Sequence, residues 1–131
     1  VLVSGGGSNL QAILDAIAAG TLDARVSVVL SSRADAYALE RATAAGIPTA
    51  VLAPREFPSR AAYDEALVER LRNAGVEWIA LAGFMRVLTP AFLTAFPDRV
   101  LNIHPSLLPA FPGVDAQTQA FEYGVKVAGC T

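Results

Sequence analysis

The sequence predicts an α/β domain of the doubly wound, Rossmann-like class, with a mainly parallel sheet and helices on both of its faces. Short apolar runs alternate along the chain with longer segments whose apolar residues recur every three or four positions, and this alternation is typical of a parallel sheet. Hydrophobic residues make up 53% of the 131 residues and charged residues only 17%, as expected for strands buried on both faces. We expect one domain spanning residues 1–131.

The strands are expected where apolar and β-branched residues cluster between turn residues. The first strand leads directly into a glycine-rich loop, and Pro48 opens the third. The five expected strands are Val1–Val3, Val26–Leu30, Thr49–Leu52, Trp78–Leu81 and Val100–Ile103.

Each helix is expected from a helical repeat or from its start and stop signals. The first has apolar residues at positions 10, 13, 14 and 17 and is closed by Gly20, while Ser8 and Gln11 have the spacing of a capping box. Thr89-Pro90 is a typical helix start. The later helices are expected over Tyr37–Ala45, from Ser59 or Arg60 to Gly75, from Pro90 to about Phe96, and over Asp115–Tyr123. In the third helix we expect the charged residues to face solvent, namely Asp64, Glu65, Glu69, Arg70 and Arg72.

Composition and charge restrict the class of protein. The net charge of −2 provides no basic field for nucleic acid, and no apolar run reaches the roughly 18 residues of a membrane span. The single cysteine, Cys130, cannot form an internal disulfide, which fits a reducing cytoplasm. Val1 begins inside a strand and Val125–Thr131 resembles the start of another, so we expect the N-terminal portion of a longer domain, truncated at both ends.

A glycine-rich loop, Ser4–Asn9, joins the first strand to the first helix. Free N–H groups at a helix start, together with the helix dipole, favour phosphate; a tight turn without a ligand is the alternative. The dinucleotide-binding fingerprint fits poorly because Leu10 stands in place of its third glycine. Arg33, after the second strand, keeps an NADP-binding interpretation open.

The segment Ala82–Leu88 is unusually apolar for a loop. It belongs either to the core or to the wall of a pocket for a flat heterocycle, whose polar edge would bond the loop's backbone groups. Arg60, in the first turn of the third helix, opposes the helix dipole, so it is either without effect or directed at a ligand.

The only histidine, His104, follows the fifth strand two residues after Asn102. Side chains at i and i+2 of an extended segment share a face, so both can line one cleft. An imidazole moves protons near neutral pH and an amide can donate to an oxyanion, a combination that suits carbonyl chemistry. A core histidine bonded to a backbone carbonyl is the alternative interpretation.

Three unusual loops therefore follow strands directly: Ser4–Asn9, Ala82–Leu88 and Asn102–Gly113. The carboxyl ends of parallel strands meet at one edge of the sheet, which is where such folds bind ligands. We expect the three loops to form a single cleft.

Three motifs occupy these loops in a fixed order: Ser4-Gly5-x-Gly7-Ser8-Asn9-Leu10-Gln11-Ala12, Leu81-Ala82-Gly83-Phe84-Met85-Arg86 and Leu101-Asn102-Ile103-His104-Pro105-Ser106-Leu107-Leu108-Pro109. In them, and over its whole length, the chain resembles the folate-dependent phosphoribosylglycinamide formyltransferase family. The resemblance implies transfer of the formyl group of 10-formyltetrahydrofolate, a co-substrate, to the amine of 5-phosphoribosylglycinamide in purine (IMP) biosynthesis. No metal is implied.

The resemblance also implies roles for individual residues. Asn102 and His104 would be catalytic, the substrate phosphate and nearby groups would bind Gly7, Ser8 and Asn9, and the folate would bind Arg60, Met85, Arg86, Val87, Leu88 and Asn102. The family's catalytic aspartate would lie beyond Thr131, so we expect this portion of the catalytic domain to be inactive alone. The implied partners are small molecules only, with no nucleic acid or membrane, in a cytoplasmic monomer or homodimer.

Three other interpretations stay open. One is another folate formyl-transfer enzyme such as formyltetrahydrofolate deformylase, although that family typically carries a His-Cys-Leu sequence where this chain has Gly7-Ser8-Asn9-Leu10. Another is a non-catalytic folate- or nucleotide-binding module of the same fold. The third is an NADP-dependent oxidoreductase.

Overall fold

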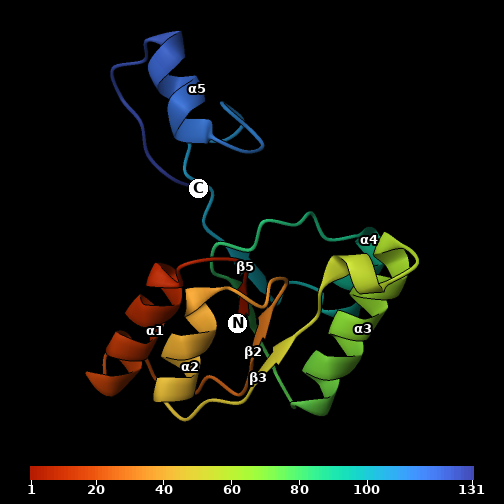
Figure 1. Cartoon of the computed structure of the whole chain (residues 1–131). Coiled ribbons are helices and arrows are strands. Elements are labelled where there is room, and N and C mark those ends of the chain that lie inside the picture. Colours follow the sequence, from red (N-terminus) through yellow and green to blue (C-terminus); the bar gives the residue numbers. More distant parts are fainter. The chain divides into compact units, whose positions relative to one another are not determined.

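In the computed structural model, which describes residues 1–131, five strands and five α-helices alternate along the chain (Figure 1). The strands are β1 (Leu2–Val3), β2 (Val29–Ser31), β3 (Thr49–Val51), β4 (Ile79–Leu81) and β5 (Val100–Asn102). The helices are α1 (Ser8–Ala18), α2 (Tyr37–Ala44), α3 (Arg60–Asn73), α4 (Pro90–Ala95) and α5 (Ala116–Tyr123), with one 3₁₀ turn, η1 (Pro54–Glu56). Contacts divide the chain into two compact units, Val1–Leu101 and Asn102–Thr131, which are described separately.

The strands form one sheet in the order β3-β2-β1-β4-β5. The pairings of β1 with β2, of β1 with β4 and of β2 with β3 are all parallel, with Leu2 opposite both Leu30 and Leu81. Successive strands are added on one side of β1 as far as β3 and then on its other side, so the strand order reverses beside β1. This is the doubly wound topology predicted from the sequence, and its ligand-binding edge lies at the carboxyl ends of β1 and β4.

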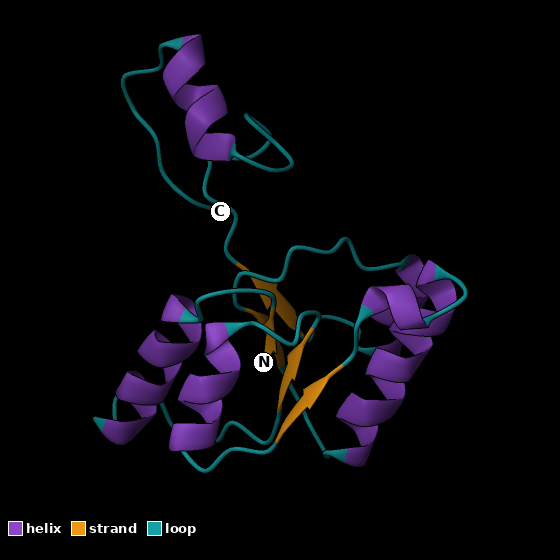
Figure 2. Cartoon of the chain, viewed as in Figure 1, coloured by secondary structure: helices purple, strands orange, loops and turns teal.

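Helices cover both faces of the sheet, with α1 and α2 on one side and α3 and α4 on the other (Figures 1 and 2). The alternation of side chains along β1 explains the two layers, because Leu2 and Val3 point to opposite faces. Leu2 belongs to the core cluster that includes α3 and α4, whereas Val3 packs with residues of α1 and α2. Both side chains are fully buried, as expected for a strand in the middle of such a sheet.

Helix ends agree closely with the predictions, and some strand ends do not. Gly20 adopts φ +70° just after α1, and the hydroxyls of Ser59 and Thr89 cap α3 and α4. The strand expected from Val26 begins only at Val29, because the parallel register pairs residues 29–31 with β3 and leaves residues 26–28 beyond the paired length.

The strand expected over Val125–Thr131 is not present as a strand in the structure. Only Thr131 pairs there: it exchanges both backbone hydrogen bonds with His104, at 2.8 and 3.0 Å. A single pair of hydrogen-bonded residues does not make that segment a strand. None of the helices in the chain combines the length and the apolar character that a membrane-crossing helix requires.

Candidate functional site

The glycine-rich loop places Gly7 at the start of α1. Gly7 has a left-handed backbone, with φ +74°, and its carbonyl accepts the Gln11 N–H at 2.9 Å. The first-turn amides that follow, at Ser8 and Asn9, have no acceptor inside the helix, and no side chain caps them. Since both residues are exposed, their N–H groups are free to bind an anion.

The predicted capping box is wrong. Ser8 is the first residue of the helix and Gly7 is the N-cap, so the Ser8 hydroxyl makes no capping bond. The Gln11 side chain points elsewhere: its amide nitrogen donates to Asp15 Oδ1 at 2.9 Å, and its oxygen accepts from Arg41 at 3.0 Å. A capping box needs Ser8 at the N-cap. Because the left-handed Gly7 is the N-cap, the helix begins at Ser8 itself, and the box cannot form.

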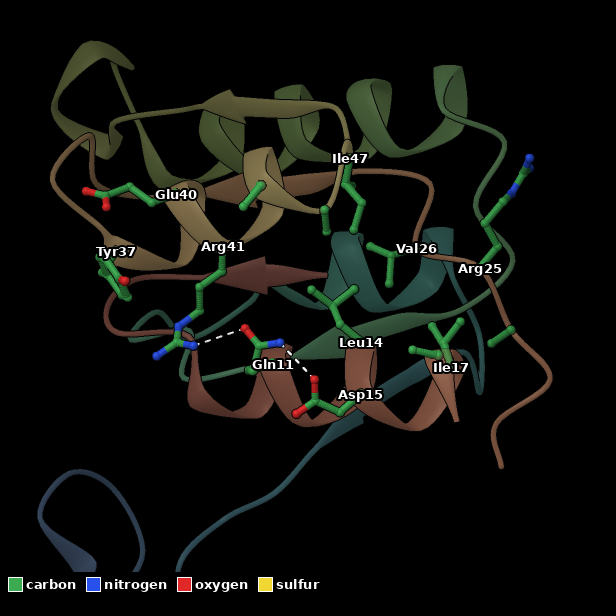
Figure 3. Close-up of a pocket in the computed structure, with 14 residues that line it drawn as sticks. Gln11, Leu14, Asp15, Ile17, Arg25, Val26, Tyr37, Glu40, Arg41 and Ile47 are labelled. Atoms are coloured by element: carbon green, nitrogen blue, oxygen red, sulfur yellow. Dashed lines mark hydrogen bonds between the residues drawn. The ribbon is translucent and has the colours of Figure 1, made fainter. Parts of the chain in front are cut away.

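Arg41 of α2 supports the glycine loop and was missed by sequence reasoning. Its Nε donates to the Gly6 carbonyl at 3.0 Å, its Nη1 donates to Gln11, and its guanidinium lies 4.9 Å from the centre of the Tyr37 ring (Figure 3). The guanidinium therefore ties the glycine-rich loop and the first turns of α1 to α2. Arg41 lies 35 residues from Gly6 along the chain, so no local pattern indicates the contact.

A groove of about 780 Å³ runs between α1 and α2, and Figure 3 shows its lining. Charged residues of both signs and aliphatic side chains line it together, including Asp15, Arg25 and Ile47. It contains none of the predicted site residues. The groove is therefore not the pocket that the sequence predicts for a heterocycle.

Some residues of the Ala82–Leu88 loop belong to the core, and others are exposed as a pocket wall would be. Ala82 and Phe84 are buried in the core, and Leu88 packs against it. Met85 and Val87, by contrast, are 73% and 76% exposed. Two large apolar side chains two residues apart thus face solvent, as the wall of a binding surface would require.

This loop is joined to the glycine-rich loop within the first unit. The Met85 N–H donates to Ser4 Oγ at 3.0 Å, and the Ala82 N–H donates to the Leu2 carbonyl at 2.8 Å. Two of the three loops expected to form one cleft are therefore neighbours at the carboxyl ends of β1 and β4. The third loop, Asn102–Gly113, belongs to the second unit, and its place in a common cleft stays a prediction.

Arg60 contacts the Ala82–Leu88 loop directly. Its Nε and Nη2 donate to the Val87 carbonyl oxygen at 3.0 and 2.7 Å. The structure therefore gives this arginine a structural role, in which it holds the loop backbone. A role toward a ligand stays a prediction, since the side chain is exposed at the same position.

The Arg86 side chain of the loop lies over the ring of Tyr63 in α3. The Arg86 guanidinium carbon is 5.9 Å from the centre of the Tyr63 ring. Tyr63 is 2% exposed, and its hydroxyl has no hydrogen-bond partner in the protein. Burial raises the pKa of Tyr63 to about 12, so the phenol is neutral at physiological pH.

Asp64 is the one charged residue of α3 that was assigned wrongly to the solvent face. It is 3% exposed, and its Oδ2 accepts the Thr89 N–H at 2.6 Å. The other four charged side chains predicted on that face are exposed, as expected. The carboxylate lies inward because it satisfies a backbone amide at the start of α4, 25 residues away.

In the second unit, His104 is half-buried and Asn102 is exposed. His104 Nε2 lies 3.0 Å from the Phe111 carbonyl oxygen, which also accepts from Ser106 Oγ at 3.2 Å. A carbonyl only accepts, so in the neutral imidazole the proton is on Nε2 and Nδ1 is left as the acceptor. The backbone-carbonyl contact that we considered as the alternative is therefore present, and it fixes the tautomer of the ring.

Arg33 is paired rather than free. Its Nη2 lies 2.6 Å from Asp35 Oδ2, and its hydrogen bonds hold the pKa of the Asp35 carboxyl below the ordinary value. Both side chains are exposed, so this is a surface ion pair, and the NADP-binding interpretation of Arg33 stays untested. The chain also contains no group of three or more His, Cys, Asp or Glu side chains placed to hold a metal ion.

Comparison with known proteins gives one consistent result. A formyl transferase family model matches residues 1–131. The phosphoribosylglycinamide formyltransferases of Escherichia coli K12 and Bacillus subtilis 168 are 49% and 45% identical over 129 and 131 residues. These matches cover 98% and 100% of this chain, but 61% and 67% of the two bacterial proteins.

The same similarity extends to a larger protein and to solved structures. The trifunctional purine biosynthetic protein adenosine-3 of Drosophila pseudoobscura is 50% identical over 133 residues, and the match spans only 10% of that protein. The crystal structure of glycinamide ribonucleotide transformylase 1 from Symbiobacterium toebii matches with a TM-score of 0.96 and 60% identity. That match covers 99% of this chain and 61% of the solved chain.

Proposed function

Because the chain belongs to the formyl transferase family over its whole length, we propose that the protein carrying it is a phosphoribosylglycinamide formyltransferase. It would transfer the formyl group of 10-formyltetrahydrofolate to the amine of 5-phosphoribosylglycinamide in purine (IMP) biosynthesis. The similarity to bacterial enzymes of that name, at 45–49% identity, supports the proposal. We further propose that it acts in the cytoplasm on small molecules, without a metal or nucleic acid, as a monomer or homodimer.

One observation carries the proposal: the free amides of α1 and the exposed Met85–Val87 loop meet at one sheet edge, linked by the Met85–Ser4 hydrogen bond. A transferase that joins a phosphorylated substrate to a heterocyclic donor needs two such neighbouring subsites. We assign the phosphate and adjacent groups to Gly7, Ser8 and Asn9, because helix N-termini bind anions well. Arg41 holds the backbone of the preceding residue, Gly6.

We assign the folate subsite to the loop residues Met85, Arg86, Val87 and Leu88 and to Arg60, and we add Asn102 of the second unit as a further proposed folate-binding residue. The exposed Met85 and Val87 side chains offer an apolar surface for a flat ring. The backbone groups of Arg86 and Leu88 have no hydrogen-bond partner within the chain, so they are available to a polar ring edge. An apolar surface beside free backbone groups fits a flat ring with a polar edge, such as a pterin. The assignment to folate itself rests on the family membership.

His104 and Asn102 are assigned the chemical step. When an amine attacks a formyl carbon, a tetrahedral oxyanion forms and the attacking nitrogen must lose a proton. The amide of Asn102 would donate a hydrogen bond to that oxygen. His104 would accept the proton at Nδ1, because its Nε2–H is held by Phe111, and would return it to the nitrogen that leaves.

The test is a formyl-transfer assay on the full-length protein. We expect formyl transfer from 10-formyltetrahydrofolate to phosphoribosylglycinamide, and negligible hydrolysis when the acceptor is omitted. Equal hydrolysis with and without the acceptor would instead identify a deformylase. Binding of phosphoribosylglycinamide and of its dephosphorylated analogue is measured in parallel, and equal affinities would contradict the phosphate site at Gly7–Asn9.

A further inference from the structure

The loop from Gly83 to Thr89 contains no regular secondary structure, yet side chains of other elements fix its backbone at three points. Ser4 Oγ accepts the Met85 N–H at 3.0 Å, and Arg60 donates twice to the Val87 carbonyl oxygen, at 3.0 and 2.7 Å. Asp64 Oδ2 accepts the Thr89 N–H at 2.6 Å. The fixed groups therefore belong to every second residue of the loop, at positions 85, 87 and 89.

We propose that Ser4 and Asp64 are positioning residues for folate binding, which hold the loop in the shape that presents Met85–Leu88 to the ring. The proposal rests on the proposed function, because it assigns the loop to folate. Arg60 makes the third contact, but it also belongs to the assigned folate subsite. Variants of Ser4 and Asp64 therefore test support of the loop without removing a group that contacts the ligand.

Burial excludes direct ligand contact for both residues. Ser4 is 6% exposed and Asp64 3% exposed, so neither side chain reaches the surface that Met85 and Val87 occupy. Ser4 is placed by a second bond, at 2.7 Å between its Oγ and that of Ser32. The Ser4 hydroxyl thus joins the ends of β1 and β2 to the loop after β4.

Asp64 is the only charged residue that is buried in the chain. A buried carboxylate is unfavourable unless it is hydrogen-bonded, and an apolar residue would be easier to accommodate on the inner face of α3. Its bond to the Thr89 N–H is of the charge-assisted kind, which is roughly twice as strong as a neutral one. A specific hold on the end of the loop accounts for a charge at this place.

Fixing the loop in advance matters because binding otherwise has to order it. An irregular segment that is already held in its bound shape loses little conformational freedom when the ligand arrives. Removing one support lets the loop sample other shapes, and the affinity falls by the fraction of molecules that leave the competent shape. The phosphate subsite on α1 does not depend on this equilibrium.

The test uses the full-length protein with Ser4→Ala, Asp64→Ala and Asp64→Asn. We expect the Kd of tetrahydrofolate to rise about tenfold in Asp64→Ala and less in Ser4→Ala, since the charged acceptor makes the stronger bond. Asp64→Asn keeps an oxygen that accepts the Thr89 N–H, so it should recover most of the loss. The Kd of phosphoribosylglycinamide should stay within about twofold throughout, a free-energy change well under 1.4 kcal/mol.

Two matched controls come from the same elements. Ser31 is buried like Ser4, but its hydroxyl bonds the backbone of Arg33 and not the loop. Glu65 follows Asp64 on α3 and is exposed. Ser31→Ala and Glu65→Ala should leave the Kd of tetrahydrofolate unchanged. Equal losses in the controls and the test variants, or losses no larger than the unfolded fraction in urea titrations, would overturn the proposal.

Amide hydrogen exchange tests the wild type without any substitution. The Met85 and Thr89 amides should exchange more slowly than those of Arg86 and Leu88, and Ser4→Ala should speed exchange at Met85. Equal rates at the four amides in the wild type would contradict the proposal even if Asp64→Ala fails to fold. A wild type that binds no tetrahydrofolate would refute the proposed function instead, so the two failures are distinguishable.

Discussion

Replacing Gly7 with alanine separates two reasons for a glycine in the glycine-rich loop. A glycine there can serve a ligand, because it lets the phosphate approach the backbone, or it can serve the fold. The structure supports the second reason directly. A Cβ placed on Gly7 would lie 2.6 Å from the Ala38 Cβ and 2.8 Å from the Ala38 Cα of α2, closer than real Cβ atoms approach.

The expected loss in the free energy of unfolding is the sum of two costs. A non-glycine residue held at φ +74° costs about 1–2 kcal/mol relative to a right-handed conformation. Relieving the clash requires a shift of α2, since one contacting atom is backbone, and overpacking of this kind typically costs about 1–3 kcal/mol. We therefore expect Gly7→Ala to lower the free energy of unfolding by about 2–5 kcal/mol.

Urea unfolding of the full-length protein without ligand measures the effect, which should lower the midpoint by roughly 1–2 M at a typical m-value. Gly5→Ala and Gly6→Ala are matched controls from the same loop, because neither residue has a positive φ and a Cβ on either would have no atom within 4 Å. Both should leave the midpoint nearly unchanged. A Gly7→Ala protein as stable as the two controls, but weakened in phosphate binding alone, would refute the reasoning from α2.

Three further predictions use the same protein. His104→Ala and Asn102→Ala should each lower kcat about 10²–10³-fold, with little change in the Kd of the phosphorylated substrate. In turnover assays the double variant should lose less activity than the two single fold-losses multiplied together. Arg86→Asp should raise the Kd of folate, followed through Trp78 fluorescence, and leave phosphate-substrate affinity unchanged; equal loss of both would indicate unfolding. Burial raises the pKa of Tyr63 to about 12 from an ordinary 10.0, so the unfolded state loses the phenol proton first and stability falls as the pH rises between those values. Urea titrations should show a loss of roughly 2–3 kcal/mol over that window in the wild type and not in Tyr63→Phe, and parallel pH curves would contradict it.

Most of the fold could be predicted because its signals are local. The helix that ends at Gly20, the caps at Ser59 and Thr89, and the alternation of strands with helices all depend on residues within one turn or one strand. The topology then follows from the rule that parallel strands need crossover helices. Strand ends such as that of Val26–Leu30 were less certain, since they are set by the length of the pairing partner and not by the strand's own residues.

The contacts that support the site could not be predicted in this way, because each joins residues far apart in the sequence. Ser4 and Met85 are 81 residues apart, Arg41 and Gly6 are 35 apart, and the polar atoms involved occur in many exposed residues as well. The motifs predicted which loops matter and what chemistry they suit. They could not predict that side chains from distant parts of the chain hold the loop backbones by hydrogen bonds.

Asp64 is the exception, since a signal for its burial was present in the sequence. It stands three and seven residues before Leu67 and Leu71, which are 1% and 0% exposed, so it lies on the buried stripe of α3. A carboxylate on such a stripe either destabilises the helix or accepts hydrogen bonds from a neighbouring element. Because Leu67 and Leu71 of the same stripe are buried, the second explanation is the better one. The neighbouring hydrogen-bond donor is here the backbone amide of Thr89, which closes the loop assigned to folate.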